Sequence, residues 1–255
     1  MLRMKLAMWK TNWKRKMQLR GSGQLAVAAM ASLVLACMLS ACVNVASYTQ
    51  PSLVRVIDAS YNAPAVNVVV EGVTLAANVG QGSISNYGTL TASTAAAIKV
   101  TEVSGSTTAL VSTTGTILAG KHHTVLLSDN GQSSTGYIVT ILEDQQTAAA
   151  SGHSAFRFIN MAPSTGAVDV YMVPSGSTLA ESKALVSNIA AGAVTDYTSF
   201  SSQTVTMEVT AYGSTTALCT QSLALTGGEV RTVLLVNTQL TSSPAIEAFV
   251  AKDVN

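Results

Sequence analysis

Two adjacent pairs of polar residues are the first candidates for chemistry in this sequence. His122 and His123 could ligate a metal ion, and Glu143 and Asp144 could act together as a general acid and base. Neighbouring residues on a strand point to opposite faces, so the two histidines cannot readily share one metal. The two carboxylates end an apolar stretch and precede a polar segment, which indicates a solvated domain edge. We therefore expect no metal site and no catalytic pair at these positions.

The other candidates also favour structural roles. A Gly-x-Ser-x-Gly nucleophile motif is absent from the sequence. The Asp-Asn-Gly tripeptide at 129–131 is typical of a tight turn and lacks the regularly spaced acidic residues of a calcium loop. Tyr87 and Tyr197 could form a sugar-stacking platform, but a repeated tyrosine that anchors a sandwich corner is favoured. We expect no enzyme activity, no catalytic residue and no cofactor.

A cysteine near the N-terminus lies in a context that predicts covalent lipid attachment. A basic segment is followed by the apolar stretch 25–39, which is short for a membrane span of roughly 20 residues. This order is that of a secretory signal. The sequence Leu-Ser-Ala-Cys at 39–42 resembles the bacterial lipobox, in which cleavage after Ala41 leaves Cys42 as the acylated N-terminus. The resemblance implies anchoring to a membrane through lipid on Cys42, and Val43 implies sorting to the outer membrane.

Alternatives to this anchor stay open on the sequence alone. An ordinary signal cleaved nearby would release a soluble protein, an uncleaved segment would remain as a membrane anchor, and residues 34–37 form a second, weaker lipobox. Lipidation of Cys42 and loss of the signal would leave Cys219 without a cysteine partner in the chain. Because Cys219 lies in an alternating stretch, we expect it to be a small buried thiol.

The distribution of charge argues against nucleic acid as a partner. Seven of the 14 basic residues, and none of the 13 acidic ones, precede Cys42. The rest of the chain is therefore net acidic, whereas nucleic-acid binding depends mainly on neutralising phosphates. The basic residues of the signal are Arg3, Lys5, Lys10, Lys14, Arg15, Lys16 and Arg20.

The chain after the signal aligns with itself, which predicts two copies of one domain. The hexapeptide Gly-Ser-Thr-Thr-Ala-Leu at 105–110 recurs at 213–218, and Thr-Val-Leu-Leu at 124–127 recurs at 232–235. A polar segment of small residues between the copies is typical of a linker. The predicted organisation is a signal peptide at 1–41, a lipidated tether at 42–51, a first domain at 52–145, a linker at 146–153 and a second domain at 154–255.

Alternation of apolar residues predicts that both copies are built of strands. Val205, Met207 and Val209 fall on one face of such a stretch. About seven strands per copy, with turns at intervals of roughly 8 to 12 residues, predict an all-β chain of two tandem antiparallel β-sandwich domains, immunoglobulin-like in type. A closed barrel is the alternative. The second copy has additional residues, including 180–189, that allow a helical turn, and the stretch 98–103 is one residue out of phase, which predicts a bulge or turn difference.

The opening of each copy resembles a bacterial family called DUF4397, a domain of unknown function. The segment Arg-Val-Ile-Asp-Ala-Ser-Tyr-Asn-Ala-Pro-Ala-Val-Asn-Val at 55–68 is similar to the start of that family's pattern, and 157–171 repeats it. Asp58 and Asn160 stand where the family often has His, and Tyr61 replaces its first proline. The resemblance implies a β-sandwich in exported, often lipid-anchored envelope proteins, commonly with tandem copies and without established catalytic residues.

The residues of this motif suggest a structural role on their own account. Arg55 and Arg157 each lie on an initial strand near an Asp or Asn that follows a proline turn. We expect each arginine to fix its turn by hydrogen bonds rather than to bind a ligand.

These observations favour a non-catalytic, lipid-anchored cell-envelope protein, structural or mediating protein or glycan contacts. An accessory subunit of an envelope transport or assembly complex is a second hypothesis, and an envelope-polymer hydrolase is a third with little sequence support. The ligand, any envelope protein partner, and the periplasmic or surface orientation are not specified by the sequence.

Overall fold

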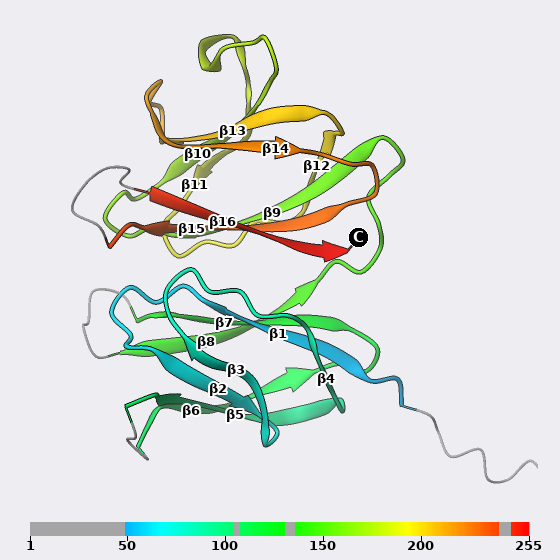
Figure 1. The fold of residues 1–255 in the computed structure, drawn as a ribbon, viewed down its shortest axis with the longest axis vertical. Helices are drawn as coiled ribbons and strands as arrows, with labels where there is room; N and C mark the ends of the chain where they lie inside the picture. Colours follow the sequence, from blue (N-terminus) through cyan, green and yellow to red (C-terminus); the bar gives the residue numbers. More distant parts are fainter. Residues whose placement is uncertain (1–48, 105–107, 131–135, 240–245, 255) are drawn as a thin grey trace, which may run out of the picture. The chain divides into compact units, whose positions relative to one another are not determined.

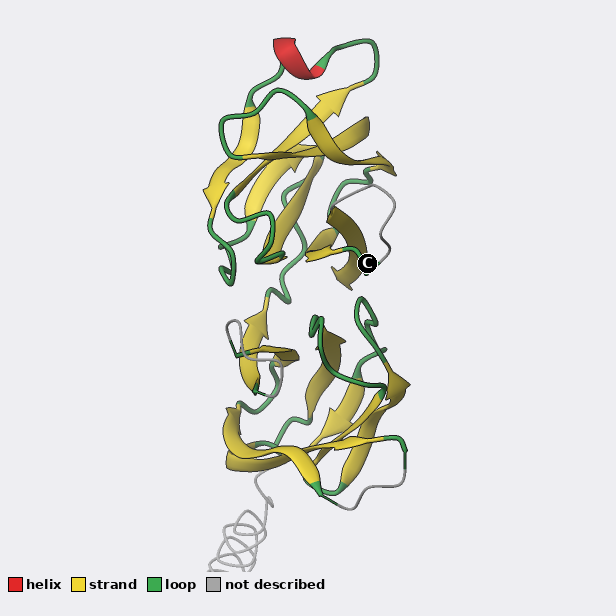
Figure 2. Ribbon diagram, turned by 90° about the vertical axis from the view of Figure 1, so that its left-hand side faces the viewer, coloured by secondary structure: helices red, strands yellow, loops and turns green. Residues whose placement is uncertain are grey.

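Strands form almost all of the regular structure of this protein (Figures 1 and 2). The structure is a computed structural model that describes residues 49–104, 108–130, 136–239 and 246–254. The helical element among these residues is the short 3-10 turn η1 (Leu179–Glu181), within the additional residues of the second copy. No helix in the described ranges is long and apolar enough to cross a membrane. The signal segment, Ala41 and Cys42 lie outside the described residues.

The first eight strands form one β-sandwich, which we call the first module. One sheet has the order β4-β1-β7-β8 and the other the order β3-β2-β5-β6 (Figure 1). The strands are β1 (Ser52–Asp58), β2 (Val66–Val70), β3 (Val73–Val79), β4 (Gly88–Leu90), β5 (Ser93–Glu102), β6 (Ala109–Ile117), β7 (His122–Asp129) and β8 (Tyr137–Asp144).

The next eight strands form the second module with the same plan. Its sheets have the orders β12-β9-β15-β16 and β11-β10-β13-β14, so each strand has a counterpart in the first module. The strands are β9 (His153–Met161), β10 (Val168–Pro174), β11 (Ala184–Ile189), β12 (Thr198–Ser201), β13 (Thr204–Ala211), β14 (Ala217–Ala224), β15 (Val230–Asn237) and β16 (Ile246–Val254).

The sandwich class expected from the sequence is confirmed, and two details differ from that expectation. Each module has eight strands rather than about seven. The modules are also not wholly antiparallel, because β1 pairs with β7 in parallel and β9 pairs with β15 in parallel. The other strand pairs within the described ranges are antiparallel. Each module therefore brings the first strand of its chain segment into the middle of a sheet.

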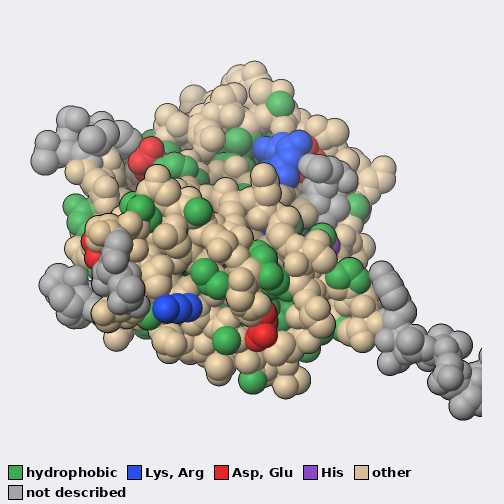
Figure 3. Space-filling model, turned by 60° about the horizontal axis from the view of Figure 1, so that its bottom comes forward, with side chains coloured by type: hydrophobic (Ala, Val, Ile, Leu, Met, Phe, Trp, Pro, Cys, Tyr) green, Lys and Arg blue, Asp and Glu red, His purple; other side chains and the backbone are tan. Residues whose placement is uncertain are grey.

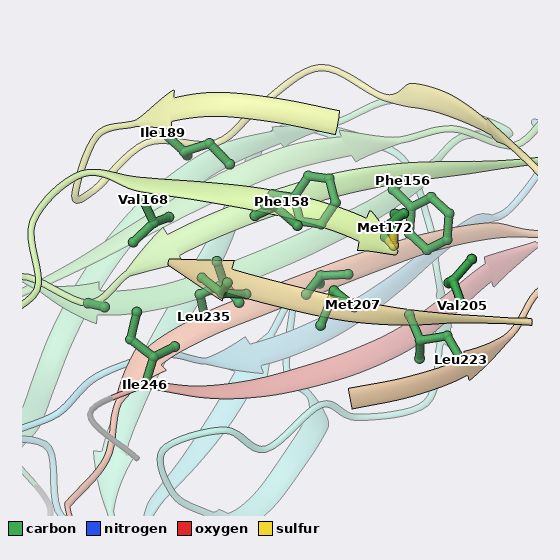
Figure 4. Packing of buried hydrophobic residues seen from close by; sticks show 14 of the residues in the cluster. Phe156, Phe158, Val168, Met172, Ile189, Val205, Met207, Leu223, Leu235 and Ile246 are labelled. Carbon is green, nitrogen blue, oxygen red and sulfur yellow. The ribbon is translucent and has the colours of Figure 1, made fainter. Parts of the chain in front are cut away.

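Alternation along the strands fills the core of each module from both sheets. Val205, Met207 and Val209 all point into the core of the second module, as their spacing predicted. Phe156 and Phe158 enter the same core from β9, with their rings 6.2 Å apart (Figure 4). An equivalent core of Val, Ile, Leu and Ala fills the first module.

The predicted phase difference between the two copies lies in a turn. The hydrogen bond from Val103 N to Ala65 O matches the one from Tyr212 N to Ala167 O, so the strands agree up to that point. The first module therefore has its additional residue in the turn that connects β5 to β6, beyond Val103. This result agrees with the bulge or turn difference expected from the sequence.

A third apolar cluster contains residues from both modules. Ile57 comes from β1, Ala59 from the turn after it and Leu126 from β7. The second module contributes Ile159 and Leu234, the counterparts of Ile57 and Leu126, and also Val236. We call this cluster the apolar joint. Its buried members are Ile57, Ala59, Leu126, Ile159, Leu234 and Val236.

Candidate functional site

Each module carries an arginine in the middle of its first strand, and both arginines are buried. On β1, Val54 and Val56 point into the module core, so Arg55 between them points to the opposite face of the sheet. On β9, Phe156 and Phe158 do the same on either side of Arg157. Arg55 is 1% exposed and Arg157 is 3% exposed. The alternation of the strand therefore places two full positive charges at the joint between the modules.

Arg55 forms its shorter ion pair with a carboxylate of the other module, and its Nε also lies 3.8 Å from Asp144 Oδ2 of its own module. Its Nη2 lies 2.6 Å from Asp253 Oδ1, and both side chains are almost fully buried. The same nitrogen donates to Thr232 Oγ1 at 3.2 Å, and Nε donates to Thr124 Oγ1 at 2.9 Å. Arg55 thus connects β1 and β7 of the first module with β15 and β16 of the second.

Arg157 forms the reciprocal ion pair. Its Nη2 lies 2.6 Å from Asp144 Oδ1 at the end of β8, and it also donates to Thr232 Oγ1 at 3.0 Å. Nη1 donates to the backbone carbonyl of Glu143 at 3.2 Å. The arginine of each module therefore pairs with the aspartate of the other, which is a crossed arrangement.

Threonine and tyrosine hydroxyls complete the hydrogen bonding of the two carboxylates. Thr124 and Tyr87 donate to Asp144, each at 2.7 Å from Oδ2. In the second module, Thr232 and Tyr197 both donate to Asp253 Oδ2, again at 2.7 Å. We call these residues the charge network. It consists of Arg55, Tyr87, Thr124 and Asp144 with their counterparts Arg157, Tyr197, Thr232 and Asp253.

The charge network is electrically balanced, with two guanidinium groups and two carboxylates. Burial alone would lower the pKa of Arg55, but Asp253, Tyr87 and Asp144 outweigh it and raise this pKa above its ordinary value. Burial raises the pKa of Tyr87 and of Tyr197, so both phenols keep their protons and act as donors. A buried charge is tolerated when it is paired and hydrogen-bonded. Each charge here is paired, and Nε of Arg157 is buried without a hydrogen-bond partner.

The tyrosines support the joint and are not arranged as a sugar platform. The guanidinium carbon of Arg55 lies 4.9 Å from the ring centroid of Tyr87, and that of Arg157 lies 5.0 Å from the ring centroid of Tyr197. The ring of His122 also approaches Tyr87, at a centroid distance of 5.2 Å and a tilt of 47°. Each arginine therefore covers one face of its tyrosine ring.

An open groove lies beside the charge network and is lined by both modules. Its volume is about 470 Å³. Ser85, Asn86 and Tyr87 line it from the first module, and Lys252 and Asp253 line it from β16. Arg55 also lines the groove, and the ammonium group of Lys252 pairs with Glu229 at 2.7 Å.

Two interpretations from the sequence are wrong at this joint. Asp144 is not part of a solvated domain edge, because it is 2% exposed and paired with Arg157. Glu143 alone has that role, since it is exposed and pairs with Lys121. The arginines do not fix their own proline turns either. The side chains that brace the nearby hairpins are Asn67, which accepts from Asn78 N, and its counterpart in the second module.

The remaining sequence candidates occupy separate places. His122 and His123 point to opposite faces, as expected, and His123 is buried with its Nε2 accepting from Leu118 N. Asp129 accepts hydrogen bonds from two backbone amides of the turn after β1. Cys219 is half-buried and free, and burial raises the pKa of its thiol. Among the described residues, no group of three or more His, Cys, Asp and Glu could hold a metal.

The sequence did not predict that Thr124, Thr232 and Asp253 belong to a site. A signal for the threonines was present, because both begin the repeated Thr-Val-Leu-Leu sequence. The aspartates end equivalent strands, β8 and β16, but their neighbours in the sequence are unrelated. The repeated sequence therefore contributes residues to the joint between the modules as well as to the core of each module.

Comparison with known proteins supports the family resemblance. Residues 52–171 match the family model described as Domain of unknown function (DUF4397), which spans the first module, the linker and the start of the second module. No curated protein matches the chain. A candidate cell adhesion protein from Bacteroides eggerthii DSM 20697 is similar at 12% sequence identity and a TM-score of 0.18, with 80% of this chain and 95% of that chain covered.

Proposed function

We propose that this DUF4397-domain protein is a non-catalytic, lipid-anchored protein of the bacterial cell envelope that mediates contacts through two locked sandwich modules. The observation that carries the proposal is the crossed charge network. Arg55 and Arg157 each form their shortest ion pair with the carboxylate of the other module. The buried charged side chains of the chain therefore connect the two modules.

The chemistry of the charge network fits binding better than catalysis. Both carboxylates accept hydrogen bonds from a guanidinium, a threonine and a tyrosine, which leaves neither poised to remove a proton from a substrate. Raised pKa values keep Tyr87 and Tyr197 protonated, so neither is a phenolate base at neutral pH. Buried, hydrogen-bonded groups of this kind fix the position of the surfaces around them and do not convert a substrate.

The exposed surface is suited to neutral polar contacts. On the face drawn in Figure 3, charged side chains are few and stand apart among neutral ones. The groove beside the charge network is a concave feature that both modules line. A partner bound in the groove would contact both modules at once. A change in the relative position of the modules would change the shape of the groove.

The anchor in this proposal is the lipid on Cys42. The tether 42–51 leads directly into β1, and at full extension it would reach about 35 Å from the membrane. Two or more acyl chains hold a protein durably on a bilayer, whereas a single chain does so only marginally. Val43 after the cysteine supports retention in the outer membrane, facing the periplasm or the cell surface.

The experiment is membrane fractionation of the full chain and of its Cys42→Ser variant, with protease treatment of intact and lysed cells. We expect the wild-type protein in the membrane fraction and the variant in the soluble fraction. A variant that stays with the membrane would refute the lipid anchor. Cleavage of the wild type on intact cells would indicate surface display, and protection until lysis would indicate the periplasmic face.

A further inference from the structure

Asp58, at the end of β1, is a fully buried carboxyl group with one oxygen left without a partner. Its exposed fraction is 0%. Oδ1 accepts from Ser60 N at 3.0 Å and from Ser60 Oγ at 2.5 Å. Oδ2 is buried and has no hydrogen-bond partner. An unpaired buried carboxylate oxygen destabilises the folded state, so this atom needs an explanation.

The second module shows what this position requires. Asn160 is the counterpart of Asp58, and its Oδ1 accepts from Ala162 N, as Asp58 Oδ1 accepts from Ser60 N. The other atom of the amide, Nδ2, donates to Gly166 O at 2.9 Å and to Ile189 O at 2.8 Å. The pocket around the second atom therefore consists of backbone acceptors and calls for a donor.

The backbone around Asp58 matches that around Asn160. Gly82 N donates to Asp58 O and Gly192 N donates to Asn160 O, both at 2.7 Å. Val79 pairs with the first residue of β2 as Ile189 pairs with the first residue of β10. The residues before them, Asn78 and Asn188, have φ values of 53° and 56°, so both hairpins have the same left-handed bulge.

By this equivalence, the carbonyl oxygen of Val79 is the acceptor expected beside the unpaired atom of Asp58. Gly166 has a φ of 81°, which its counterpart Pro64 cannot adopt, so the carbonyl at this position cannot be placed in the same way in the first module. A carboxylate oxygen and a carbonyl oxygen are both acceptors and repel each other, whereas a protonated carboxyl group donates as an amide does. We propose that Asp58 holds a proton on Oδ2, donates it to Val79 O, and makes the joint between the modules weaken as the pH rises.

The charged surroundings of Asp58 also favour the protonated form. Burial is the main cause that raises its pKa, the hydrogen bonds from Ser60 act in the opposite direction, and the like charge of Asp129 on β7 raises it further. Tyr137 on β8 is a neutral phenol whose own pKa is raised. In the described part of the chain, the turn 80–83 and the paired ends of β2 and β3 bring no charged side chain to Asp58. No cation therefore offsets the loss of this proton.

Asp58 is connected to the joint through its neighbours. Ile57 and Ala59, on either side of it, belong to the apolar joint. The carbonyl oxygen of Asp58 accepts a hydrogen bond from Gly82 N, and the ring of Phe249 from the second module lies against that glycine. Ionisation of Asp58 would push the β3 hairpin away from β1 and disturb the surface on which Phe249 rests.

The test compares the wild-type full chain with Asp58→Asn in detergent micelles, by urea unfolding from pH 4 to pH 8. A group whose pKa is raised on folding destabilises the folded state as the pH rises from its unfolded pKa through its folded pKa. We expect the unfolding constant of the wild type, relative to D58N, to increase by tenfold for each unit by which folding raises the pKa. A ratio that stays constant across this range would overturn the proposal.

The reverse substitution, Asn160→Asp, is the matched variant. It puts a carboxyl group into the equivalent pocket of the second module, so we expect it to add a second pH-dependent loss of stability. An N160D protein without this loss would also overturn the proposal. Amide hydrogen exchange in the 80–84 turn, compared with the 190–194 turn and with D58N, locates the weakening. Exchange that rises with pH equally in both turns, or equally in D58N, would show that the joint is not linked to Asp58.

This inference does not depend on the proposed function. Fractionation of Cys42→Ser addresses the anchor, and the pH series addresses a carboxyl group inside the first module. Failure of either experiment leaves the other result standing.

Discussion

At Arg55 and Arg157, a full charge is held where almost no water reaches it. Removing an ion from water costs several kcal/mol even after the protein relaxes. The cost is offset only because each guanidinium meets a carboxylate of the other module at 2.6 Å and additional hydroxyl groups. Breaking one pair should therefore be much more harmful than the absence of both charges.

Asp253→Ala tests this asymmetry. The substitution removes the closer of the two buried carboxylates beside Arg55, leaving Asp144 Oδ2 at 3.8 Å from its Nε, and it removes the acceptor of Tyr197 and Thr232. We therefore expect a loss of about 3–5 kcal/mol in the free energy of unfolding. Urea unfolding followed by circular dichroism measures it. The control is Lys121→Ala, which breaks an exposed pair with Glu143 and should cost at most about 1 kcal/mol. Equal losses in the two variants would contradict the buried character of the charge network.

The sequence predicted some of these residues and misplaced others for a physical reason. Arg55 and Arg157 stood out because the repeat preserves them, but their partners lie in the other module. Asp144 was expected at a solvated edge because a polar linker follows it. Local sequence gives the polarity of neighbours along the chain, and it gives no information on a counter-charge contributed from another strand.

At the scale of elements, the turns after the first strands show how two equivalent glycines can face different surroundings. Gly82 and Gly192 have the same φ of 82° and the same hydrogen bond to the strand before them. A Cβ atom on Gly82 would lie 2.3 Å from the ring of Phe249, whereas a Cβ atom on Gly192 would meet no atom within 4 Å. Backbone strain is therefore common to both positions, and steric conflict is confined to one.

Gly82→Ala and Gly192→Ala form a matched pair. The shared strain of a left-handed alanine costs roughly 1–2 kcal/mol, so we expect about that loss for Gly192→Ala. Gly82→Ala should lose more, because Phe249 must also move out of the joint. Thermal unfolding of the two variants compares them directly. Identical shifts would indicate that Phe249 yields without cost, and Phe249→Ala in the G82A background should recover the steric part.

Strand faces were predictable, and strand order was not. Alternation assigned Val205, Met207 and Val209 to the core, because side chains on a strand alternate between its two faces. Alternation is silent about which strands become neighbours. The parallel pairing of β1 with β7 depends on the path of the chain between the sheets, which leaves no periodic mark in either strand.

At the scale of the molecule, the two modules share more than a linker. The apolar joint contains buried residues of both, and the charge network crosses between them twice. Domains connected only by a linker unfold independently, whereas a large shared interface couples their unfolding. The tandem organisation could be inferred from the repeat, but this coupling could not, because the residues responsible look like ordinary strand residues.

We expect the wild-type protein to unfold in one cooperative calorimetric transition, with equal calorimetric and van't Hoff enthalpies. Leu234→Asp places a charge in the apolar joint while the core of each module remains intact, so two separate transitions should replace the single one. Leu118→Asp is the control, since Leu118 is 45% exposed and the substitution should preserve one transition. Two transitions already in the wild type would show that the modules are energetically independent.

The central position of β1 has a mechanical consequence. The chain enters β1 from its N-terminal side, and β1 pairs in parallel with β7 at six positions and in antiparallel with β4 at three more. Tension on the chain ahead of Thr49 would act along the length of β1. The strand would have to slide between its two neighbours, so its hydrogen bonds would share the load and would not open one at a time. This pairing of β1 would therefore resist unfolding when tension is applied at the N-terminal end.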